Sequence, residues 1–521
     1  MSETTDLGRP LAGLTPPPVW LVALTGLSGS MPVVMAAAMS NIAVPSIMGA
    51  YGVGQNQAQW ASTAFVATMV VSQLLNAWAS RALGRRTAFM TAIGVFFVGG
   101  VISATAPGIE VLIAGRVLQG AAAGVLQATS LISIVTAYPA ARRRFAVSLF
   151  GTGQLLALGI GPVIGGMVID GLAWPYAFLA PLPLLAIGLL LAPLAMPGRD
   201  DETPAPAFDW AGFGLCCLVV FCLVGTLGNG HRLGWGSLEI LLMMVTGTVA
   251  LTAFILVETI KLDPVLDVSL FRDVNFAAVV GMAAMFGFTS FAFDYGIPVM
   301  VQTVQGLTPT SAGLLVLPGG LLLMGLMPLG GWLADRLPTW IPLLLGFCIN
   351  GVAALGLSTT DVNTPTLLLF AYVTTAFFSW GLIIPALAGS VIAHIPADRI
   401  NQGIAAYNFT RQLGGSLGIA VMVLVIDVRT AVHAEALAAT QTAGNPFSRE
   451  LLAKVERLLH EGGLAGAHLK SGALDYLGRV VHAQATTFGF QDAFLALACM
   501  FVIALVPAWF VARATDRSGK R

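Results

Sequence analysis

Residues 145–171 read FAVSLFGTGQLLALGIGPVIGGMVIDG, with no charged side chain between Phe145 and Ile169. A helix needs about 20 consecutive apolar residues to cross the hydrocarbon layer of a bilayer, so this stretch is long enough to span a membrane. Comparable uncharged stretches recur from Val19 almost to the C-terminus. Of all residues, 57% are hydrophobic and 10% are charged, whereas soluble domains carry about 25% charged residues. The sequence therefore predicts an all-α integral membrane protein.

Apolar windows of about 20 residues, separated by turn-forming or charged residues, predict fourteen spans. Their expected starts are Val19, Gln59, Thr87, Val111, Phe145, Tyr176, Trp210, Leu238, Asn275, Thr310, Thr339, Thr366, Gln402 and Phe488. Polar linkers flank the seventh and eighth spans. The predicted divisions are an N-terminal tail (1–18), a six-helix bundle (19–196), linkers with two extra helices (197–274), a second six-helix bundle (275–513) that includes a long external loop (428–487), and a C-terminal tail (514–521).

The distribution of lysine and arginine predicts the orientation of these spans, because short cytoplasmic loops are enriched in both residues. With the N-terminus inside, the cytoplasmic set is Arg9, Arg81, Arg85, Arg86, Arg142, Arg143, Arg144, Arg199, Lys261, Arg272, Arg336, Arg399, Arg513, Arg517, Lys520 and Arg521. The short external loops then hold only Arg232. Both termini are therefore predicted to be cytoplasmic.

Charge and residue spacing argue against several classes of function. The formal net charge is zero, which gives no electrostatic reason to expect nucleic acid as a partner. The five cysteines lie in apolar segments without the paired spacing of metal ligands, so neither a metal site nor another cofactor is expected. The histidines fall in predicted loops and no clustered catalytic groups occur, which leaves a membrane-embedded enzyme or sensor as a remote alternative.

Two loops at equivalent places in the two halves contain matching short motifs. Residues 76–86 read NAWASRALGRR, a tight basic turn that resembles the cytoplasmic signature of the major facilitator superfamily. Asn76 and Ser80 stand where the family pattern has glycine and aspartate. Residues 331–336, GWLADR, keep the acid but lack the following Gly-Arg-Arg. The resemblance implies gating roles for Arg81, Gly84, Arg85, Arg86, Asp335 and Arg336, although ordinary positive-inside arginines would explain the basic residues alone.

Two further motifs lie inside predicted spans. Residues 159–166, GIGPVIGG, resemble the signature of antiporters in that superfamily, and we expect Gly159, Gly161, Pro162, Gly165 and Gly166 to form a gating bend where helices approach closely. Residues 116–120, RVLQG, resemble its buried-arginine motif. Arg116, Gln119 and Gln127 recur at helical spacing on one polar stripe, which is expected to face a substrate cavity. The alternative for Arg116 is a position near the external interface from which its side chain reaches water.

Residues 408–418, NFTRQLGGSLG, together with the fourteen spans and the long loop before the last one, resemble the drug:proton antiporters of the EmrB/QacA type. Residues 41–45, NIAVP, follow the same pattern, but Ala36 stands where that family usually has an aspartate. The resemblance implies a bacterial inner-membrane exporter of amphipathic drug-like compounds that exchanges them for protons. It adds Asn41, Asn408 and Arg411 to the expected cavity.

Asp294 is the carboxylate placed farthest inside an apolar span, within residues 289–295, TSFAFDY. Burial favours the protonated form of a carboxyl group and water favours the ionised form, so an acid whose surroundings change can carry a proton. Gln302 lies on the same helical face and is expected to line the cavity. We predict Asp294 as the proton-coupling residue, with Arg116 as its electrostatic counterweight or as a substrate contact. A purely structural Asp294, paired with a neighbouring helix, is the alternative.

The long external loop has helix-forming composition in two stretches, residues 428–441 and 449–460, and the turn Gly462-Gly463 lies just after the second stretch. Leu451, Val455, Leu458 and Leu459 recur at helical spacing, which predicts a helical hairpin with one packing face. In the EmrB-like branch such a loop lies beside a membrane-anchored adaptor. The hairpin is therefore expected either to dock a periplasmic adaptor that leads to an outer-membrane channel or to form a self-packed cap.

One alternative within transport also remains. An exporter or facilitator for a single metabolite, such as a fatty or aromatic acid, would use the buried arginines as anion contacts. The sequence leaves the substrate, the proton stoichiometry and the oligomeric state open.

Overall fold

The computed structural model describes residues 17–139, 142–199, 207–261, 264–393, 395, 399–442 and 444–518, and every regular element among them is helical. The α-helices are α1 (Val19–Tyr51), α2 (Gln55–Ala58), α3 (Trp60–Ser72), α4 (Asn76–Ala82), α5 (Arg85–Ala104), α6 (Ile109–Ala137), α7 (Arg143–Gly171), α8 (Leu182–Ala195), α9 (Trp210–Leu233), α10 (Leu238–Ile260), α11 (Val274–Thr303), α12 (Pro309–Arg336), α13 (Trp340–Leu357), α14 (Thr366–Ala393), α15 (Ile400–Thr440), α16 (Pro446–Glu461) and α17 (Ala467–Ser518). Short 3-10 helices are η1 (Gln73–Leu75), η3 (Trp174–Phe178) and η4 (Val268–Arg272).

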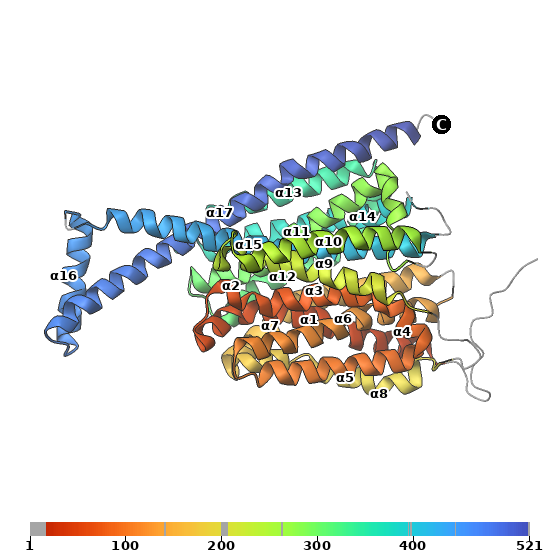
Figure 1. Ribbon diagram of the computed structural model, residues 1–521, viewed down its shortest axis with the longest axis horizontal. Helices are drawn as coiled ribbons and strands as arrows, with labels where there is room; N and C mark the ends of the chain where they lie inside the picture. Colours follow the sequence, from red (N-terminus) through yellow and green to blue (C-terminus); the bar gives the residue numbers. More distant parts are fainter. Residues whose placement is uncertain are drawn as a thin grey trace, which may run out of the picture.

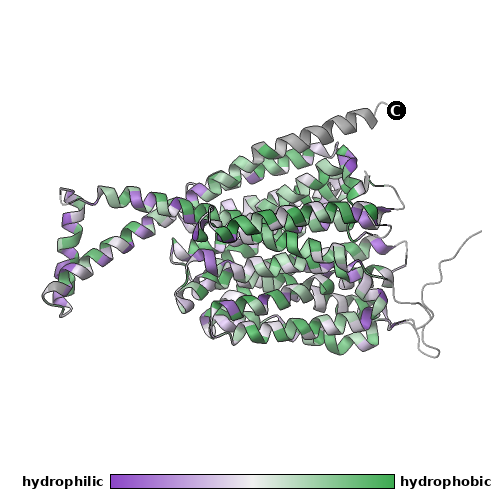
Figure 2. Ribbon diagram, in the orientation of Figure 1, coloured by the Kyte–Doolittle hydropathy of each residue, from purple (hydrophilic) through white to green (hydrophobic). Residues whose placement is uncertain are grey.

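Twelve helices of the described chain are long and apolar enough to cross a membrane by length and composition. Two further stretches fill the remaining places of the fourteen predicted spans. The first runs from Trp60 to Ala82 through α3, η1 and α4, and the second is the later part of α17. The predicted all-helical membrane architecture is confirmed, and Figure 2 shows the apolar residues spread along the bundled helices.

The helices form two bundles that meet along α7 and α12. In the first bundle α1 packs against α6, α7 and α8, while α6 packs against α3 and α5. In the second, α11 and α17 pack against α15, and α14 packs against α12 and α13. The extra helices α9 and α10 pair with each other, and α9 also contacts α3 of the first bundle and α15 of the second (Figure 1). The extra pair therefore lies across one junction between the bundles.

Residues 428–487 form an arm that extends beyond the bundles (Figure 1). Its three sides are the end of α15, α16 and the beginning of α17, so it is a continuation of two spans rather than the separate hairpin expected from the sequence. Val455 faces inward, but Leu458 is 58% exposed, so the prediction that Leu458 belongs to the packing face is wrong. We call the end of the bundles nearest the arm the arm side and the opposite end the tail side.

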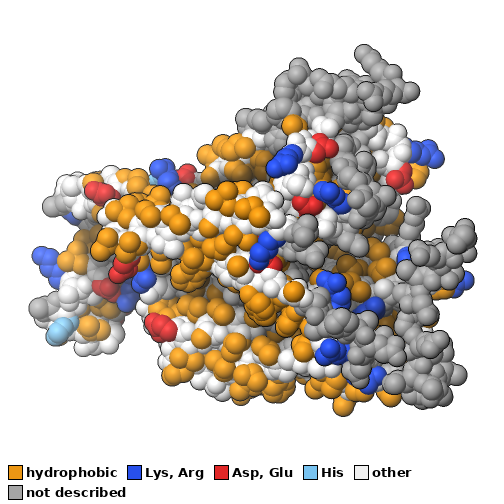
Figure 3. All heavy atoms as spheres, turned by 45° about the vertical axis from the view of Figure 1, so that its right-hand side comes forward, with side chains coloured by type: hydrophobic (Ala, Val, Ile, Leu, Met, Phe, Trp, Pro, Cys, Tyr) orange, Lys and Arg blue, Asp and Glu red, His pale blue; other side chains and the backbone are white. Residues whose placement is uncertain are grey.

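The arm side also holds the end of α11. Thr303 and Val304 line a small pocket with Val480 and Thr487 of α17, at the base of the arm. Figure 3 shows basic side chains gathered toward the end away from the arm, with apolar surface between the two ends. This distribution agrees with the grouping of arginines on which the predicted orientation rests.

Glycines allow α11 and α15 to pack at backbone contact. A Cβ atom added to Gly287 would lie 1.7 Å from the carbonyl oxygen of Arg411, and one added to Gly414 would lie 2.1 Å from that of Ala284. Because backbone atoms cannot rotate away as side chains can, larger residues at these positions would force the helices apart. The glycines of the 408–418 motif therefore fix the distance between the two helices.

We predict that Gly287→Ala lowers the free energy of unfolding by about 1–3 kcal/mol, which is the usual cost of overpacking a core. Gly281→Ala on the same helix is the matched control, because no atom lies within 4 Å of the Cβ it would add. Thermal unfolding in detergent should separate the two variants. Equal stability of both would contradict the tight α11 contact.

Candidate functional site

Asp294 lies on α11, in the half nearer the arm side, nine residues or about 14 Å from the end of the helix at Thr303. Its side chain is partly exposed, and no hydrogen bond or ion pair of its carboxylate is found among the described residues. Exposing a charged group to hydrocarbon at this depth costs several kcal/mol. We therefore infer that the exposed part of Asp294 faces water within the protein.

The helix around Asp294 is held against the first bundle by polar contacts with α1. The Asn41 amide donates a hydrogen bond of 3.1 Å to the backbone carbonyl of Asp294, and its own oxygen accepts one of 2.6 Å from Ser62. Two turns further along α11, the Gln302 amide donates to the carbonyl of Ile42 at 3.2 Å. Asn41 and Gln302, both predicted from the sequence as cavity residues, thus join α1 to α11 beside the acid.

Arg116 is completely buried in the first bundle. Its guanidinium donates hydrogen bonds to the carbonyl of Ala61 at 2.7 Å, to the Gln119 side chain at 2.6 Å and to the carbonyl of Ala36 at 3.4 Å. It also lies over the rings of Phe65 and Phe178, 4.1 and 5.4 Å from their centres. No ion pair of Arg116 with a carboxylate is found in the described chain, and the arrangement rules out a side chain that reaches water at the external interface.

This environment shows what compensates the missing family aspartate. Arg116 reaches the backbone of Ala36, the position where an acid was expected, and carbonyl oxygens and aromatic faces surround the cation instead. Carbonyl dipoles and ring faces stabilise a buried guanidinium without neutralising it. The first bundle therefore carries a buried positive charge that no described acid neutralises.

Arg411 lies on α15, eleven residues or about 17 Å from the beginning of that helix at Ile400. It is partly exposed, and no hydrogen bond or ion pair of its guanidinium is found in the described part of the chain. Because α11 and α15 pack in parallel with Gly287 opposite Arg411, Asp294 lies seven residues, or about 10 Å, nearer the arm side. The described chain thus contains no pair between Asp294 and either arginine.

The other predicted cavity residues lie on α15 and α6. Asn408 is partly exposed one turn before Arg411. Gln127 of α6 donates a hydrogen bond of 3.3 Å to Gln154 of α7, so it joins two helices of the first bundle. Gln119 is buried with Arg116.

One pair of residues between the bundles was not predicted from the sequence. Gln73 of η1 and Gln412 of α15 exchange two amide hydrogen bonds, of 2.7 and 3.2 Å. Both lie near the middle of their spans, where an isolated amide must find a polar partner. Isolated glutamines in apolar segments were the available signal, but sequence alone could not pair positions so far apart.

The GIGPVIGG motif of α7 packs on both sides. Gly161 and Gly165 face Met35 and Met39 of α1, whose atoms would lie 3.2 and 2.8 Å from an added Cβ. Toward the second bundle, a Cβ at Gly166 would lie 2.4 Å from the carbonyl oxygen of Pro309 on α12. The motif residues therefore lie between a helix of their own bundle and a helix of the other.

The contact between α7 and α12, which we call the arm-side seam, extends over several turns. A Cβ at Gly313 would lie 2.4 Å from the carbonyl oxygen of Pro162, and Gly159 faces Gly320. At the arm-side end, the Asp170 carboxylate accepts a hydrogen bond of 2.9 Å from the backbone N–H of Thr310, in the first turn of α12. A carboxylate is favoured there by the helix dipole, so Asp170 adds a polar contact across the closed seam.

The predicted gating residues on the tail side make contacts within their own halves. Gly84, at φ 82°, approaches the backbone of Arg199 closely enough to exclude a side chain. Arg85 donates to Thr136 at 2.7 Å and Arg86 to the carbonyl of Met196 at 3.0 Å, which fastens the loop to the ends of α6 and α8. Arg81 is exposed and donates only weakly to the carbonyl of its own helix at Ala77.

In the second half, Arg336 lies over the ring of Trp332 at 4.5 Å and Asp335 is exposed. The structure shows no hydrogen bond or ion pair between these two residues and the basic loop of the first half, within the described residues. The gating roles implied by the two loops therefore stay predictions.

Comparison with known proteins gives consistent results. The family model described as Major Facilitator Superfamily matches residues 26–419. The chain is 25% identical to the probable multidrug resistance protein EmrY of Escherichia coli, over 98% of each chain, and 27% identical to the multidrug export protein EmrB of Haemophilus influenzae, over 92% of each. Among solved structures, a POT family transporter in complex with 5-aminolevulinic acid matches with a TM-score of 0.65 over 96% of each chain at 12% identity, which speaks for the fold alone.

We predict that Gly166→Ala prevents full closure of the arm-side seam, because its Cβ would overlap the backbone of Pro309. In a protein without native cysteines, a cysteine at Val163, which lies against Gly313 across the seam, should then react faster with a water-soluble alkylating reagent. Gly151→Ala on the same helix is the control, since nothing lies within 4 Å of its added Cβ. Unchanged labelling in Gly166→Ala would argue that the seam does not depend on this contact.

Proposed function

The chain belongs to the major facilitator superfamily, and we propose that it exports amphipathic drug-like compounds in exchange for protons by alternating access. Family membership makes it a membrane transporter rather than an enzyme, as the sequence predicted. The relatives named as multidrug resistance or export proteins support the substrate class. The observation that carries the coupling proposal is Asp294, a partly exposed acid without a partner among the described residues, beside the contact between α1 and α11.

The proposed cycle uses Asp294 as the group that alternates between proton and substrate. When its surroundings open to the side of higher proton concentration, the carboxyl binds a proton; when they open to the other side, substrate binding favours release of that proton. Asn41 binds the backbone of Asp294 rather than its carboxylate, so the side chain remains available. One titrating group at the inter-bundle contact is sufficient for coupled exchange.

The driving force suits such an exchange. One proton that crosses about 100 mV releases about 2.3 kcal/mol, and one pH unit adds about 1.4 kcal/mol. Since about 1.4 kcal/mol corresponds to a tenfold concentration ratio, one proton per uncharged substrate supports a gradient of a few hundredfold. No second coupling acid at position 36 is required.

The two arginines receive different proposed roles. Arg116 is buried in this conformation. Its proposed role is a fixed positive charge that makes ionisation of nearby acidic groups, of the protein or of a substrate, less costly. Arg411 is partly exposed and about 10 Å from Asp294 along the helix axis, so it is available to an anionic group of a substrate. Gln127, Asn408 and Gln302 would supply further polar contacts.

We predict that Asp294→Asn abolishes efflux driven by a pH gradient, because the amide cannot change its charge, while leaving the protein folded. Substrate-induced proton release in detergent should disappear as well. Asp475→Asn, which changes an exposed acid of the arm, is the control and should transport normally. Normal pumping by Asp294→Asn at every pH would make Asp294 structural, and transport of one anionic metabolite without proton exchange would favour the single-metabolite alternative.

The proposed location is the inner membrane of a bacterium, with both termini in the cytoplasm and the arm in the periplasm. The grouping of basic residues at the tail side supports this orientation (Figure 3).

A cysteine at Lys454, exposed on α16, should therefore react with an impermeant label applied to intact spheroplasts. A cysteine at Asp335, exposed at the end of α12, should react only after the membrane is opened. The reverse pattern would invert the proposed topology.

We further propose that the arm docks a periplasmic adaptor that leads to an outer-membrane channel. Leu437, Leu451 and Val481 line a pocket of about 180 Å³ between the three sides of the arm. Phe447, which also lines this pocket, is 83% exposed and Leu458 is 58% exposed, so both present apolar surface to a partner. Large exposed apolar residues far from the bilayer favour a protein contact.

Replacing Phe447 and Leu458 together by aspartate should weaken co-purification of the adaptor and resistance of whole cells, because burying the new charges in an interface is costly. Transport in proteoliposomes should be unchanged. Leu451→Asp is the comparison, because it introduces a charge inside the arm and should destabilise it. If the double variant loses transport in proteoliposomes, the arm acts as a cap of the transporter itself.

A further inference from the structure

Three charged residues meet on the tail side where the extra helices begin and end. Asp209 caps the first turn of α9, where its Oδ1 accepts a hydrogen bond of 2.7 Å from the backbone N–H of Gly212. Lys261, directly after α10, forms an ion pair with the same oxygen. Glu258 lies in the last turn of α10 and is only 3% exposed. Together they connect the start of α9 to the end of α10.

Each of the two carboxylates has one oxygen bound and one oxygen free. Glu258 accepts a hydrogen bond of 3.0 Å through Oε2 from the backbone N–H of Leu266. Glu258 Oε1 and Asp209 Oδ2 are buried and have no hydrogen-bond partner among the described residues. A buried carboxylate oxygen without a donor costs free energy, so two such oxygens require an explanation.

The two free oxygens converge on the same space above Gly212. A Cβ atom at this glycine would lie 2.2 Å from Glu258 Oε1 and 2.6 Å from Asp209 Oδ2, so the oxygens are no more than about 5 Å apart. Only a residue without a side chain leaves this space open. Each oxygen is an acceptor, and a single proton between them would turn one into a donor for the other.

The charges of Asp209, Glu258 and Lys261 also favour one proton on the pair of carboxylates. Burial opposes ionisation of Asp209, but hydrogen bonds from Lys261 and Gly212 outweigh it and hold the pKa of this carboxyl below its ordinary value. Asp209 therefore stays ionised and is paired with Lys261, whose single positive charge also acts on Glu258, so among the described residues one lysine faces two carboxylates. Two carboxylates this close do not both ionise readily.

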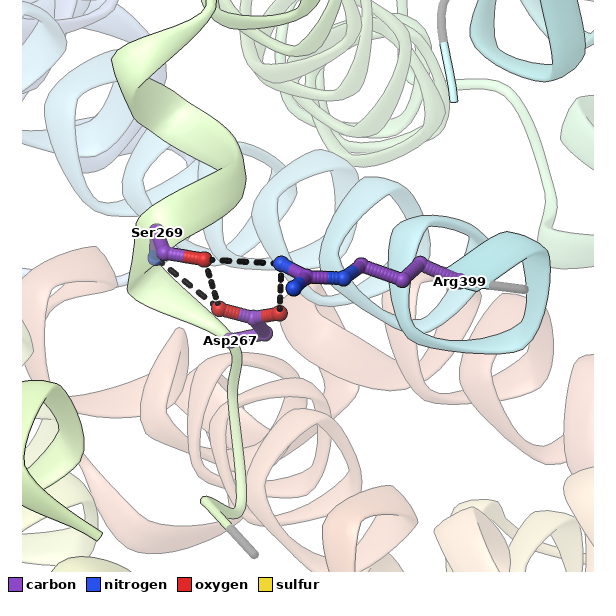
Figure 4. Close-up of polar contacts among 3 residues, drawn as sticks. All are labelled: Asp267, Ser269 and Arg399. Atoms are coloured by element: carbon purple, nitrogen blue, oxygen red, sulfur yellow. Dashed lines mark hydrogen bonds and ion pairs between the residues drawn. The ribbon is translucent and has the colours of Figure 1, made fainter. Parts of the chain in front are cut away.

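The other ionisable groups that the structure describes around the pair provide no second positive charge. Cys216 of α9, which interacts with Glu258, is buried. Asp267 is already bound to Arg399, at 3.3 Å, and to Ser269, as Figure 4 shows. Arg81 of α4, whose neighbour Trp78 packs on Trp210, is exposed and bonded to the backbone of its own helix.

We propose that Glu258 holds a proton that it donates to Asp209, which makes this pair a proton-binding site separate from the transport pathway around Asp294. Besides joining α9 to α10, Glu258 binds the chain at Leu266 that leads into η4. Arg399 in turn fastens η4, through Asp267 and Ser269, to the start of α15 (Figure 4). Loss of the proton places two anions side by side and loosens this connection between the extra helices and the second bundle.

The sign of the pH effect is set by proton binding. A folded protein that holds a proton which the unfolded chain releases is most stable at low pH and loses that stability as pH rises. Glu258→Gln supplies an N–H donor of the same shape, so this variant imitates the protonated pair and should not respond to pH in this range. Gly212→Ala should separate the oxygens and abolish the shared proton.

The experiment uses the full-length Asp294→Asn protein in detergent, so that the acid of the transport pathway does not contribute. Infrared spectra near neutral pH should contain the C=O band of a protonated carboxyl that disappears at high pH, and Glu258→Gln should remove this band and the accompanying fall in Tm. Glu239→Gln, at the opposite end of α10, is the matched control and should leave both unchanged.

The proposal is overturned if the Asp294→Asn protein, which still carries Glu258, shows no band of a protonated carboxyl. The proposal also fails if the Glu258→Gln variant keeps the band or the same dependence of Tm on pH. A Tm that depends on the concentration of Na⁺ or K⁺ instead of on pH would overturn it too, because a metal cation would then lie between the two oxygens. None of these outcomes depends on the outcome of the transport assays, because no substrate is present.

Discussion

The free-energy cost of placing a charge in an apolar environment determines where the ionisable side chains of this protein lie. Arg116 meets this cost with two backbone carbonyls, a glutamine and two aromatic rings, and remains charged and buried. Asp294 lacks such partners in the described chain and is partly exposed, so its ionised form is favoured only where water reaches it. The surroundings of Arg116 therefore keep a fixed cation in the first bundle, and those of Asp294 leave an acid in the second bundle free to gain or lose a proton.

The acid lies where the bundles touch, and in the proposed cycle the same contact opens during transport. Glycines at the arm-side seam bring α7 and α12 to backbone distance, so closure depends on the shape of the helices more than on strong bonds. Asp170 contributes one hydrogen bond at the end of the seam, and Gln73 with Gln412 contributes two near the middle of the spans. A few hydrogen bonds and many weak contacts allow two states of similar free energy.

Much of this architecture was predictable because it depends on short-range patterns. The number of spans follows from the length of apolar windows, and the glycine motif of α7 indicated a close helix contact before its partner α12 was known. The depth of Asp294 in its span likewise indicated an unusual acid. Each of these signals lies within one helix, where the spacing of residues determines which face they share.

Other features depend on tertiary contacts that local patterns do not encode. Gln73 and Gln412 belong to different bundles, and Asp209 meets Glu258 only because α9 and α10 pack side by side. Leu458 fitted the apolar stripe of α16 by its spacing, but the arm buries a neighbouring face and leaves Leu458 exposed. The absence of an acid at Ala36 raised a question that only the surroundings of Arg116 could answer.

The central claim is that protonation of Asp294 controls which side of the molecule opens. It is tested most directly by the distance between spin labels at Gly54 in the first bundle and Val362 in the second, both exposed near the arm side, in a protein without native cysteines. The account predicts two distance populations whose ratio changes with pH, and a ratio that no longer changes in Asp294→Asn. A single distribution that is independent of pH in the parent protein, or the same pH response in Asp294→Asn, would contradict it.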